Sequence, residues 1–371
     1  DVKLIGGVRL GTSLDDKDAF LTFQNYRKRI DWGLTYYRSN VSNYDGFYRG
    51  IDYNTSVDYN LLDNVVITNL YQANVSYPFN EVNRLSLVMG LRKDIGTLRP
   101  EYAGVALYPD VLKLPDSVSS TIISRLEFVH DNTIHPADNI WNGFRWKIYT
   151  ELFVPANAAS ALKNKNTINV GIDARHYLKI YRNFIWAVRA AADFSFGDAR
   201  LIYYLGGEDG WVYPKFNHLD ADTRVPYSFQ TLALNLRGFN QNAANGSNNA
   251  VINSELRLPV FTTLLSSPIN NAFLRNFQLV QFIDLGTAWA GPVSAIKRPT
   301  VIYHLDPPPP AGLSPLDVKI KAGGIGPFAG GYGFGAKSTL LGYFLKADIG
   351  WQMRGIFRGP AVFYFCLGFD F

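Results

Sequence analysis

Residues 361–371 read AVFYFCLGFDF and alternate between two kinds of side chain. The odd-numbered positions are apolar and mostly aromatic, whereas the even-numbered positions are mixed and include Tyr364, Cys366 and Asp370. Because successive side chains of a β-strand point to opposite faces, this pattern predicts a strand with one apolar and one partly polar face. The segment has about the length that a tilted strand needs to cross a lipid bilayer.

The same alternation recurs in segment after segment of the chain. In residues 144–154, Trp146 and Ile148 occupy one face, and Arg145 and Lys147 occupy the other. The apolar faces carry many Phe, Trp and Tyr side chains, as lipid-facing strands with aromatic girdles do. A soluble sandwich usually has an aliphatic apolar face, so the pattern favours an all-β, antiparallel transmembrane barrel.

The composition agrees with a membrane barrel. Of the 371 residues, 15% are aromatic, 18% are charged and 47% are hydrophobic, and the mean hydropathy is −0.05. Lipid-facing and lumen-facing side chains that alternate give such a near-zero average. No apolar run reaches the roughly 18 residues of a transmembrane helix. The net charge of +5 is dispersed, which argues against nucleic acid as a partner.

About fourteen segments are predicted to be strands by their alternation. They are residues 2–11, 19–28, 30–39, 67–78, 83–96, 119–132, 143–155, 167–180, 184–197, 248–261, 277–289, 332–341, 343–353 and 361–371. Bacterial barrels have even strand numbers, so fourteen is allowed, and sixteen is allowed if a hairpin precedes residue 1 or lies within residues 40–66. We expect one barrel domain over residues 1–371 with long extracellular loops. The start at Asp1 looks internal, and we expect the chain to be a mature or trimmed product of a longer one.

The sequence indicates no catalytic or metal-binding residues. The five histidines are scattered without metal-ligand spacing, and no Gly-x-Ser-x-Gly motif is present. The single cysteine, Cys366, excludes an internal disulfide framework and any multi-cysteine metal site. We therefore expect no catalytic residue, no metal and no cofactor.

Three charged residues, Arg237, Glu255 and Asp284, are predicted to meet. Alternation turns Glu255 and Asp284 toward the lumen from adjacent strands, where neighbouring carboxylates resist ionisation unless a cation lies between them. Arg237, in the long loop before these strands, has a planar fork of donors that suits two carboxylates. Gly238 beside it permits a tight turn. We predict that Glu255 and Asp284 hold Arg237 in the barrel lumen.

These residues, in this order, resemble the BamA superfamily of outer-membrane barrels, also called the bacterial surface antigen family. The family has an Arg-Gly-aromatic tip, preceded by a hydrophobic residue, in its sixth extracellular loop. The matching residues here are Leu236, Arg237, Gly238 and Phe239. The resemblance covers roughly residues 119–371.

A second family signature, Phe-x-Asp-x-Gly, lies on the strand two after that loop. Its residues here are Phe282, Asp284 and Gly286, and Glu255 matches the acidic position on the intervening strand. Five predicted strands follow the loop, as in the family, which implies sixteen strands in the whole barrel.

The chain departs from the family pattern just before the loop tip. Residues 208–235, which are rich in aromatic side chains, separate the Gly206-Gly207 pair from the tip. We expect this insertion to form an extra lid or partner surface. The insertion resembles a Bacteroidota-type branch of the family, in which a β-propeller-like region can precede the barrel. This resemblance implies that a periplasmic N-terminal region lies upstream, outside this chain.

The C-terminal strand carries Phe363, Phe365, Phe369 and Phe371 on its apolar face. The resemblance implies that this terminal aromatic pattern is an outer-membrane sorting and assembly signal. Gly368 on the other face would let the strand kink at a seam with the first strand and act as a gate. Unpaired backbone groups at such a seam could template an incoming strand.

The resemblance implies an outer-membrane protein of a Gram-negative bacterium that takes part in insertion, assembly or translocation of other proteins. The implied partners are outer-membrane lipid and lipopolysaccharide, client polypeptides, and periplasmic or surface lipoprotein subunits. The residues leave open an alternative, a passive pore or a structural membrane anchor, because lumen charges of both signs suit a pore too.

Overall fold

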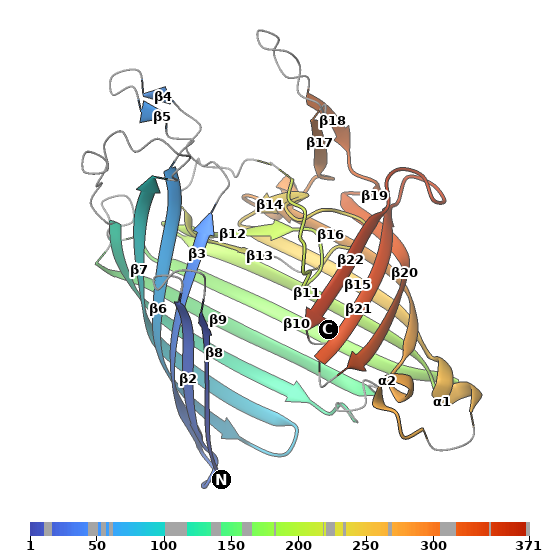
Figure 1. The fold of residues 1–371 in the computed structure, drawn as a ribbon, viewed down its shortest axis with the longest axis horizontal. Helices are drawn as coiled ribbons and strands as arrows, with labels where there is room; N and C mark the ends of the chain where they lie inside the picture. Colours follow the sequence, from blue (N-terminus) through green and yellow to red (C-terminus); the bar gives the residue numbers. More distant parts are fainter. Residues whose placement is uncertain are drawn as a thin grey trace. The chain divides into compact units, whose positions relative to one another are not determined.

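A computed structural model describes most of the chain. The described residues are 1–10, 17–43, 51–52, 57–58, 62–100, 117–134, 142–157, 165–181, 183–217, 219, 227–232, 235–265, 269–304, 317–340 and 343–368. The largest sheet has 15 strands (Figure 1). The chain divides into two compact units, Asp1–Glu127 with Glu151–Asn166, and Phe128–Thr150 with Thr167–Phe371.

The first unit is an antiparallel meander in which each strand pairs with the next. Its strands are β1 (Val2–Leu10), β2 (Lys17–Asn25), β3 (Asp31–Asn43), β6 (Leu62–Pro78) and β7 (Asn83–Pro100). Strands β8 (Ser117–Asp131) and β9 (Gly143–Asn157) contribute residues to both units. The two-residue strands β4 (Ile51–Asp52) and β5 (Val57–Asp58) form a separate small sheet.

The second unit continues the same pattern with seven long strands that pair antiparallel in sequence order. They are β10 (Thr167–Tyr181), β11 (Phe184–Gly197), β15 (Asn248–Pro259), β16 (Gln278–Trp289), β20 (Phe328–Leu340), β21 (Tyr343–Gln352) and β22 (Val362–Gly368). Five of these strands follow the long loop between β11 and β15. The short β19 (Gly324–Ile325) pairs only with β20.

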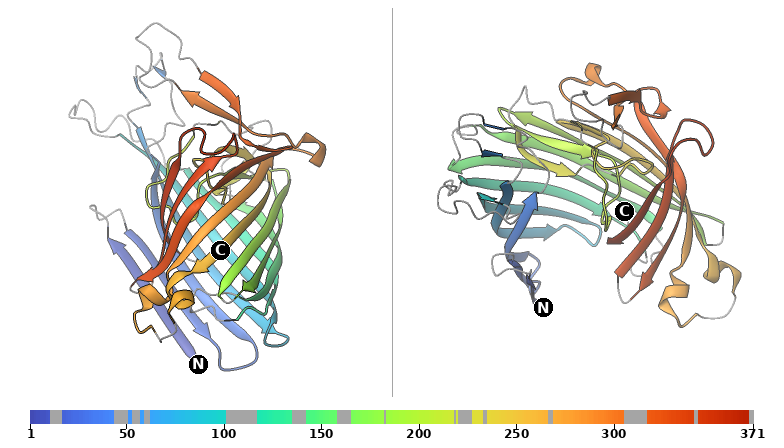
Figure 2. Two further views of the ribbon diagram at one scale, coloured as in Figure 1. Left: turned by 90° about the vertical axis from the view of Figure 1, so that its right-hand side faces the viewer. Right: turned by 45° about the horizontal axis from the view of Figure 1, so that its top comes forward.

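The connections of the second unit carry the remaining elements. The loop between β11 and β15 contains a small sheet of β12 (Arg200–Leu205), β13 (Tyr227–Leu232) and β14 (Ala244–Gly246). Helices α1 (Val260–Leu264) and α2 (Ala272–Arg275) lie at one end of the strands. At the other end, η3 (Val293–Ala295) precedes the hairpin of β17 (Thr300–His304) and β18 (Asp317–Lys321), which projects from the unit (Figure 2).

The all-β class and the large antiparallel sheet are confirmed. Each of the fourteen predicted segments corresponds to one strand of the large sheet, with ends that differ by a few residues. Within 40–66, the described residues outside β3 and β6 are those of β4 and β5, which pair with each other in a separate sheet. The single barrel of sixteen strands stays a prediction.

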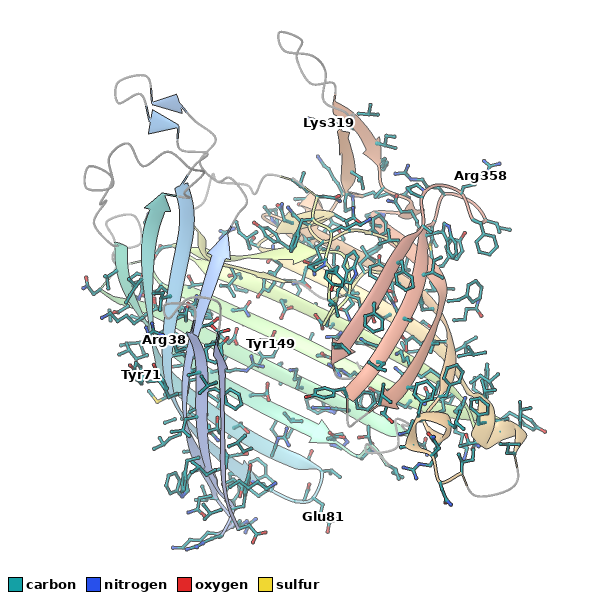
Figure 3. The ribbon with its side chains drawn as sticks, in the orientation of Figure 1. Arg38, Tyr71, Glu81, Tyr149, Lys319 and Arg358 are labelled. Atoms are coloured by element: carbon teal, nitrogen blue, oxygen red, sulfur yellow. The ribbon has the colours of Figure 1, made fainter. Side chains whose placement is uncertain are left out.

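Burial in the sheet is reversed relative to a soluble protein. On β15 and β16, the apolar Ile252, Leu279 and Ile283 are 50%, 48% and 46% exposed, whereas Glu255 and Asp284 are fully buried. We call the side with the buried charges the loop face and the other side the apolar face. In the first unit, apolar residues such as Tyr71, labelled in Figure 3, are likewise exposed. Contiguous exposed apolar surface of this kind marks a surface that contacts lipid or protein.

Aromatic side chains gather on the apolar face near the turn between β21 and β22. Trp351 packs edge-on against Phe357 at 5.0 Å between ring centroids, and Tyr332 stacks on Trp351 at 6.2 Å. Arg358, labelled in Figure 3, lies on the same turn. Rings with one polar end are favoured where an apolar layer meets water. Among the described helices, none combines the length and apolar character needed to cross a membrane.

Candidate functional site

The loop between β11 and β15 folds back onto the loop face of the second unit. Two backbone bonds tie the two sides of the loop together: the Leu236 N–H donates to the Gly207 oxygen, and the Gly207 N–H donates to the Phe239 oxygen, both at 3.1 Å. Gly207 has a φ of +75°, a left-handed conformation that favours glycine. The result places residues 236–239 directly over β16, β20 and β21.

Arg237 is the centre of the site. Its Nε and Nη2 donate to the two oxygens of Asp284 at 2.8 and 3.0 Å, which is a bidentate pair. Its Nη1 donates to Glu255 at 2.6 Å and to Asp348 at 3.1 Å. The guanidinium carbon also lies 3.8 Å from the centre of the Phe282 ring. Every guanidinium nitrogen therefore has a carboxylate partner, and the side chain is buried.

Further cations pair with Glu255 and with Glu208. Glu255 accepts from Lys337 Nζ at 2.7 Å and from Arg257 at 2.8 Å, and Lys346 Nζ lies 2.9 Å from Glu208. Four acidic and four basic side chains make up this buried network: Glu208, Glu255, Asp284, Asp348, Arg237, Arg257, Lys337 and Lys346. Equal numbers of acidic and basic side chains thus lie together, and their mutual contacts offset part of the cost of burying them.

Electrostatics keep the two loop residues of the network ionised. Burial opposes the charge of Arg237, but Asp284 and Glu255 outweigh it and raise the pKa of its guanidinium well above the usual value. Burial likewise opposes the charge of Glu208, yet Lys346 and Arg237 lower the pKa of its carboxyl below the usual range.

Glycines on β20 and β21 let the loop backbone touch the sheet backbone. A Cβ at Gly331 would lie 1.7 Å from the Arg237 carbonyl oxygen, and a Cβ at Gly350 would lie 2.8 Å from the Gly238 nitrogen. Gly238 itself has a φ of +91°, and its own Cβ would meet the Trp351 carbonyl oxygen at 2.7 Å. The backbone of the tip can approach the backbone of β20 and β21 this closely only because these positions are glycines.

Tyr364 of β22 hydrogen-bonds to the backbone of the loop tip. Its hydroxyl accepts from the Gly238 N–H and donates to the Phe239 carbonyl oxygen, both at 2.8 Å. Leu236 and Phe239, which flank Arg237 and Gly238, are buried. The Leu236 side chain packs beside Gly286, where a Cβ would meet it at 3.4 Å. The tip is thus fixed by ion pairs, backbone bonds and apolar packing together.

The structure brings most of the predicted site residues together. Eight of them meet within the second unit: Leu236, Arg237, Gly238, Phe239, Glu255, Phe282, Asp284 and Gly286. Phe363 and Phe365 lie apart, exposed on the apolar face of β22. Gly368 ends β22 opposite Phe344. Phe369 and Phe371 lie outside the described residues.

Several functional residues were not predicted from the sequence. Asp348 is a third carboxylate partner of Arg237, and Tyr364 and Gly331 hold the tip. Alternation already placed Asp348 and Tyr364 on the polar faces of their strands, so that pattern could have indicated them. Among the described residues, no group of three or more His, Cys, Asp or Glu side chains could hold a metal ion.

Comparison with solved structures identifies the fold. The structure is similar over 95% of its length to BamA from Haemophilus ducreyi lacking POTRA domains 1–3, with a TM-score of 0.53, 14% identity and 61% of that chain covered. CdiB from Acinetobacter baumannii and CdiB from Escherichia coli both give TM-scores of 0.48 at 12% identity, with 95% and 98% of this chain and 49% and 55% of theirs covered. No protein-family model and no curated protein matches the chain.

The fold is therefore that of BamA-type barrels, and the resemblance seen in the motifs is confirmed at that level. The likeness distinguishes no branch of the superfamily. The chain spans about three fifths of the solved BamA chain that it matches.

Proposed function

We propose that the chain is the membrane-spanning barrel of an outer-membrane protein that inserts, assembles or exports other proteins in a Gram-negative bacterium. The observation that carries the proposal is the loop tip. In a chain with the BamA fold, Arg237 is buried between Asp284 and Glu255 on the strands after the loop. The reversed burial of the sheet supports a lipid environment, because its exposed face is apolar.

In the proposed protein, the buried network gives the loop a single position. Ion pairs in a protein interior contribute little net stability, because desolvation offsets their attraction, but they favour one geometry strongly. A loop fixed over β16, β20 and β21 would keep the strands that follow it in register. Client polypeptides, lipopolysaccharide and lipoprotein subunits are the partners that such a barrel would contact.

Depletion of the protein in its native cells tests the function. We expect the folded amount of other outer-membrane barrels, or of an exported client, to fall before growth stops, as measured by heat-shift electrophoresis of membrane proteins. The proposal is wrong if every other barrel and every exported protein keeps its normal level after the protein has disappeared.

The second candidate is a passive pore or a structural anchor for an upstream domain. The mixed charges of the loop face favour it, since such a surface is compatible with water and ions. Two results together would support this second candidate: the purified protein conducts ions in single-channel recordings, and its depletion from cells leaves client assembly unchanged.

The membrane environment predicts the effect of a charge on the apolar face. Ile283 lies in mid-strand on β16 and is 46% exposed. If this face contacts lipid, Ile283→Arg should destabilise the folded protein in vesicles by about 2–4 kcal/mol. Urea titration in lipid vesicles measures the change.

Val318→Arg is the matched control, because Val318 is similarly exposed, at 42%, but lies on the projecting β17–β18 hairpin. It should change the stability little. Equal, small effects of both substitutions would show that the apolar face does not contact lipid.

A further inference from the structure

Residues 210–212, within the inserted part of the loop, pair with the edge of β22. The Val212 N–H donates to the Phe365 oxygen at 2.9 Å, and the Leu367 N–H donates to the Gly210 oxygen at 3.0 Å. Between these bonds, Trp211 lies opposite Cys366 in an antiparallel bridge. These three residues, which form one isolated antiparallel bridge with β22, are called the edge segment.

The edge segment and β21 occupy opposite edges of β22. Backbone hydrogen-bonding groups of successive strand residues point to alternate edges of the strand. The edge segment bonds to the backbone of Phe365 and Leu367, which point to the same edge. Strand β21 pairs with β22 along its other edge, from Val362 to Gly368. The edge that the segment occupies is therefore the one on which a further strand could add to this end of the sheet.

Side chains hold the edge segment in place. The Trp211 ring packs on the Tyr364 ring at 4.7 Å between centroids and covers the buried Cys366. A Cβ at Gly210 would lie 2.1 Å from the Leu367 carbonyl oxygen, so the close pairing requires glycine. Tyr364 also clasps the Arg237 tip, which links the edge segment to the buried network.

The edge segment pairs with β22 over a much shorter length than β21 does. The segment makes two backbone hydrogen bonds over three residues, whereas β21 pairs with seven residues of β22. A longer extended strand would form more backbone bonds on the same edge. Backbone hydrogen bonds form with almost any sequence. The incoming strand would therefore be selected only at the position that Trp211 occupies, where an aromatic or other large apolar side chain fits.

We propose that residues 210–212 are a built-in placeholder strand on the edge of β22, which an extended segment of an unfolded client protein displaces. This inference rests on the proposed assembly function. The client strand would pair with Phe365 and Leu367 and put an apolar side chain against Tyr364. Until then, the placeholder covers the edge and prevents unspecific strand addition.

Cys366 makes the inference testable by crosslinking. Trp211 and Cys366 form a non-hydrogen-bonded antiparallel pair, in which the Cα atoms lie about 4.5 Å apart, a separation that a disulfide accepts. Because Cys366 is the only cysteine, Trp211→Cys offers one intramolecular pair. We expect mild oxidation with copper phenanthroline to form the 211–366 disulfide. Val212→Cys is the matched control, since the side chain at 212 lies on the opposite face and should not crosslink.

The decisive experiment adds a client. The probe is a urea-unfolded eight-stranded outer-membrane barrel, supplied in excess to the Trp211→Cys protein in phosphatidylethanolamine–phosphatidylglycerol vesicles. We expect the probe to slow formation of the 211–366 disulfide, because it occupies the edge. An unchanged rate of disulfide formation overturns the inference, whatever the assembly activity.

A second measurement in the same vesicles follows folding of the probe by heat-shift electrophoresis. With about nine-tenths of the molecules crosslinked, the folding rate should fall about tenfold, since only the uncrosslinked fraction has a free edge, and dithiothreitol should restore it. If the crosslinked protein works at the full rate, displacement is not needed and the inference is wrong. If the wild-type protein does not accelerate folding at all, the proposed function fails, while the disulfide rate still decides the inference.

Discussion

Arg237→Ala should release the loop tip and destabilise the protein by about 3–5 kcal/mol, because it leaves Asp284, Glu255 and Asp348 buried without their shared cation. Cys366 is a natural reporter of the release. It is fully buried beneath Trp211, which packs on Tyr364, and Tyr364 in turn holds the tip. We expect a maleimide to label Cys366 much faster in the variant than in the wild-type protein.

Two controls separate the ion network from a general loss of folding. Arg358→Ala removes an exposed arginine from the turn between β21 and β22 and should leave the labelling rate unchanged. Adding Asp284→Asn to Arg237→Ala should recover part of the lost stability, because one unpaired buried charge disappears. If the maleimide labels Cys366 in the Arg237→Ala protein at the wild-type rate, Arg237 does not hold the loop.

Arg237→Lys should behave like a weaker form of the alanine variant. A lysine keeps the positive charge but has no planar fork, so it cannot form the bidentate pair with Asp284 and also reach Glu255. A labelling rate between those of the wild-type and alanine proteins would show that geometry as well as charge fixes the tip.

Gly331→Ala should displace the tip without touching a charge. The new Cβ would lie 1.7 Å from the Arg237 carbonyl oxygen, and both are backbone-anchored, so the loop must move away. The overpacking should cost at least about 1–3 kcal/mol, and Cys366 labelling should again rise. Urea titration and the maleimide assay measure the two effects.

Gly6→Ala is the matched control for that substitution. Gly6 also lies in a strand, β1, but a Cβ there would meet its nearest neighbour at 3.4 Å, an ordinary contact. It should be tolerated. If Gly331→Ala is tolerated equally well, the tip does not rest on β20 as closely as the structure has it.

The sequence predicted the strands because alternation is a local property. Residues two apart share a face, so Phe363 and Phe365 could be separated from Tyr364 and Cys366 without knowledge of any partner strand. The same rule turned Glu255 and Asp284 toward one side. The charge of Arg237 and the need of two carboxylates for a cation then indicated their meeting.

The sequence did not predict which further residues would surround the tip. Asp348 and Gly331 lie far from Arg237 along the chain, and their contacts depend on the register of β16 with β20 and of β20 with β21. Register is set by many pairings at once, and a shift by one residue would turn each side chain to the other face. The contact of Arg237 with Asp348 follows only from the register that the assembled sheet adopts.

The sequence by itself determined the strands, their two faces and the sign of the charges on each. Only the tertiary structure decided the path of the loop, because that path depends on where its backbone can approach the sheet. Gly331 and Gly350 open that approach, and residues 210–212 bond to the edge of β22 opposite β21, which no local pattern marks. Alternation can be read from one strand alone. The glycine surface under the loop tip and the edge available to residues 210–212 form only when several strands lie side by side.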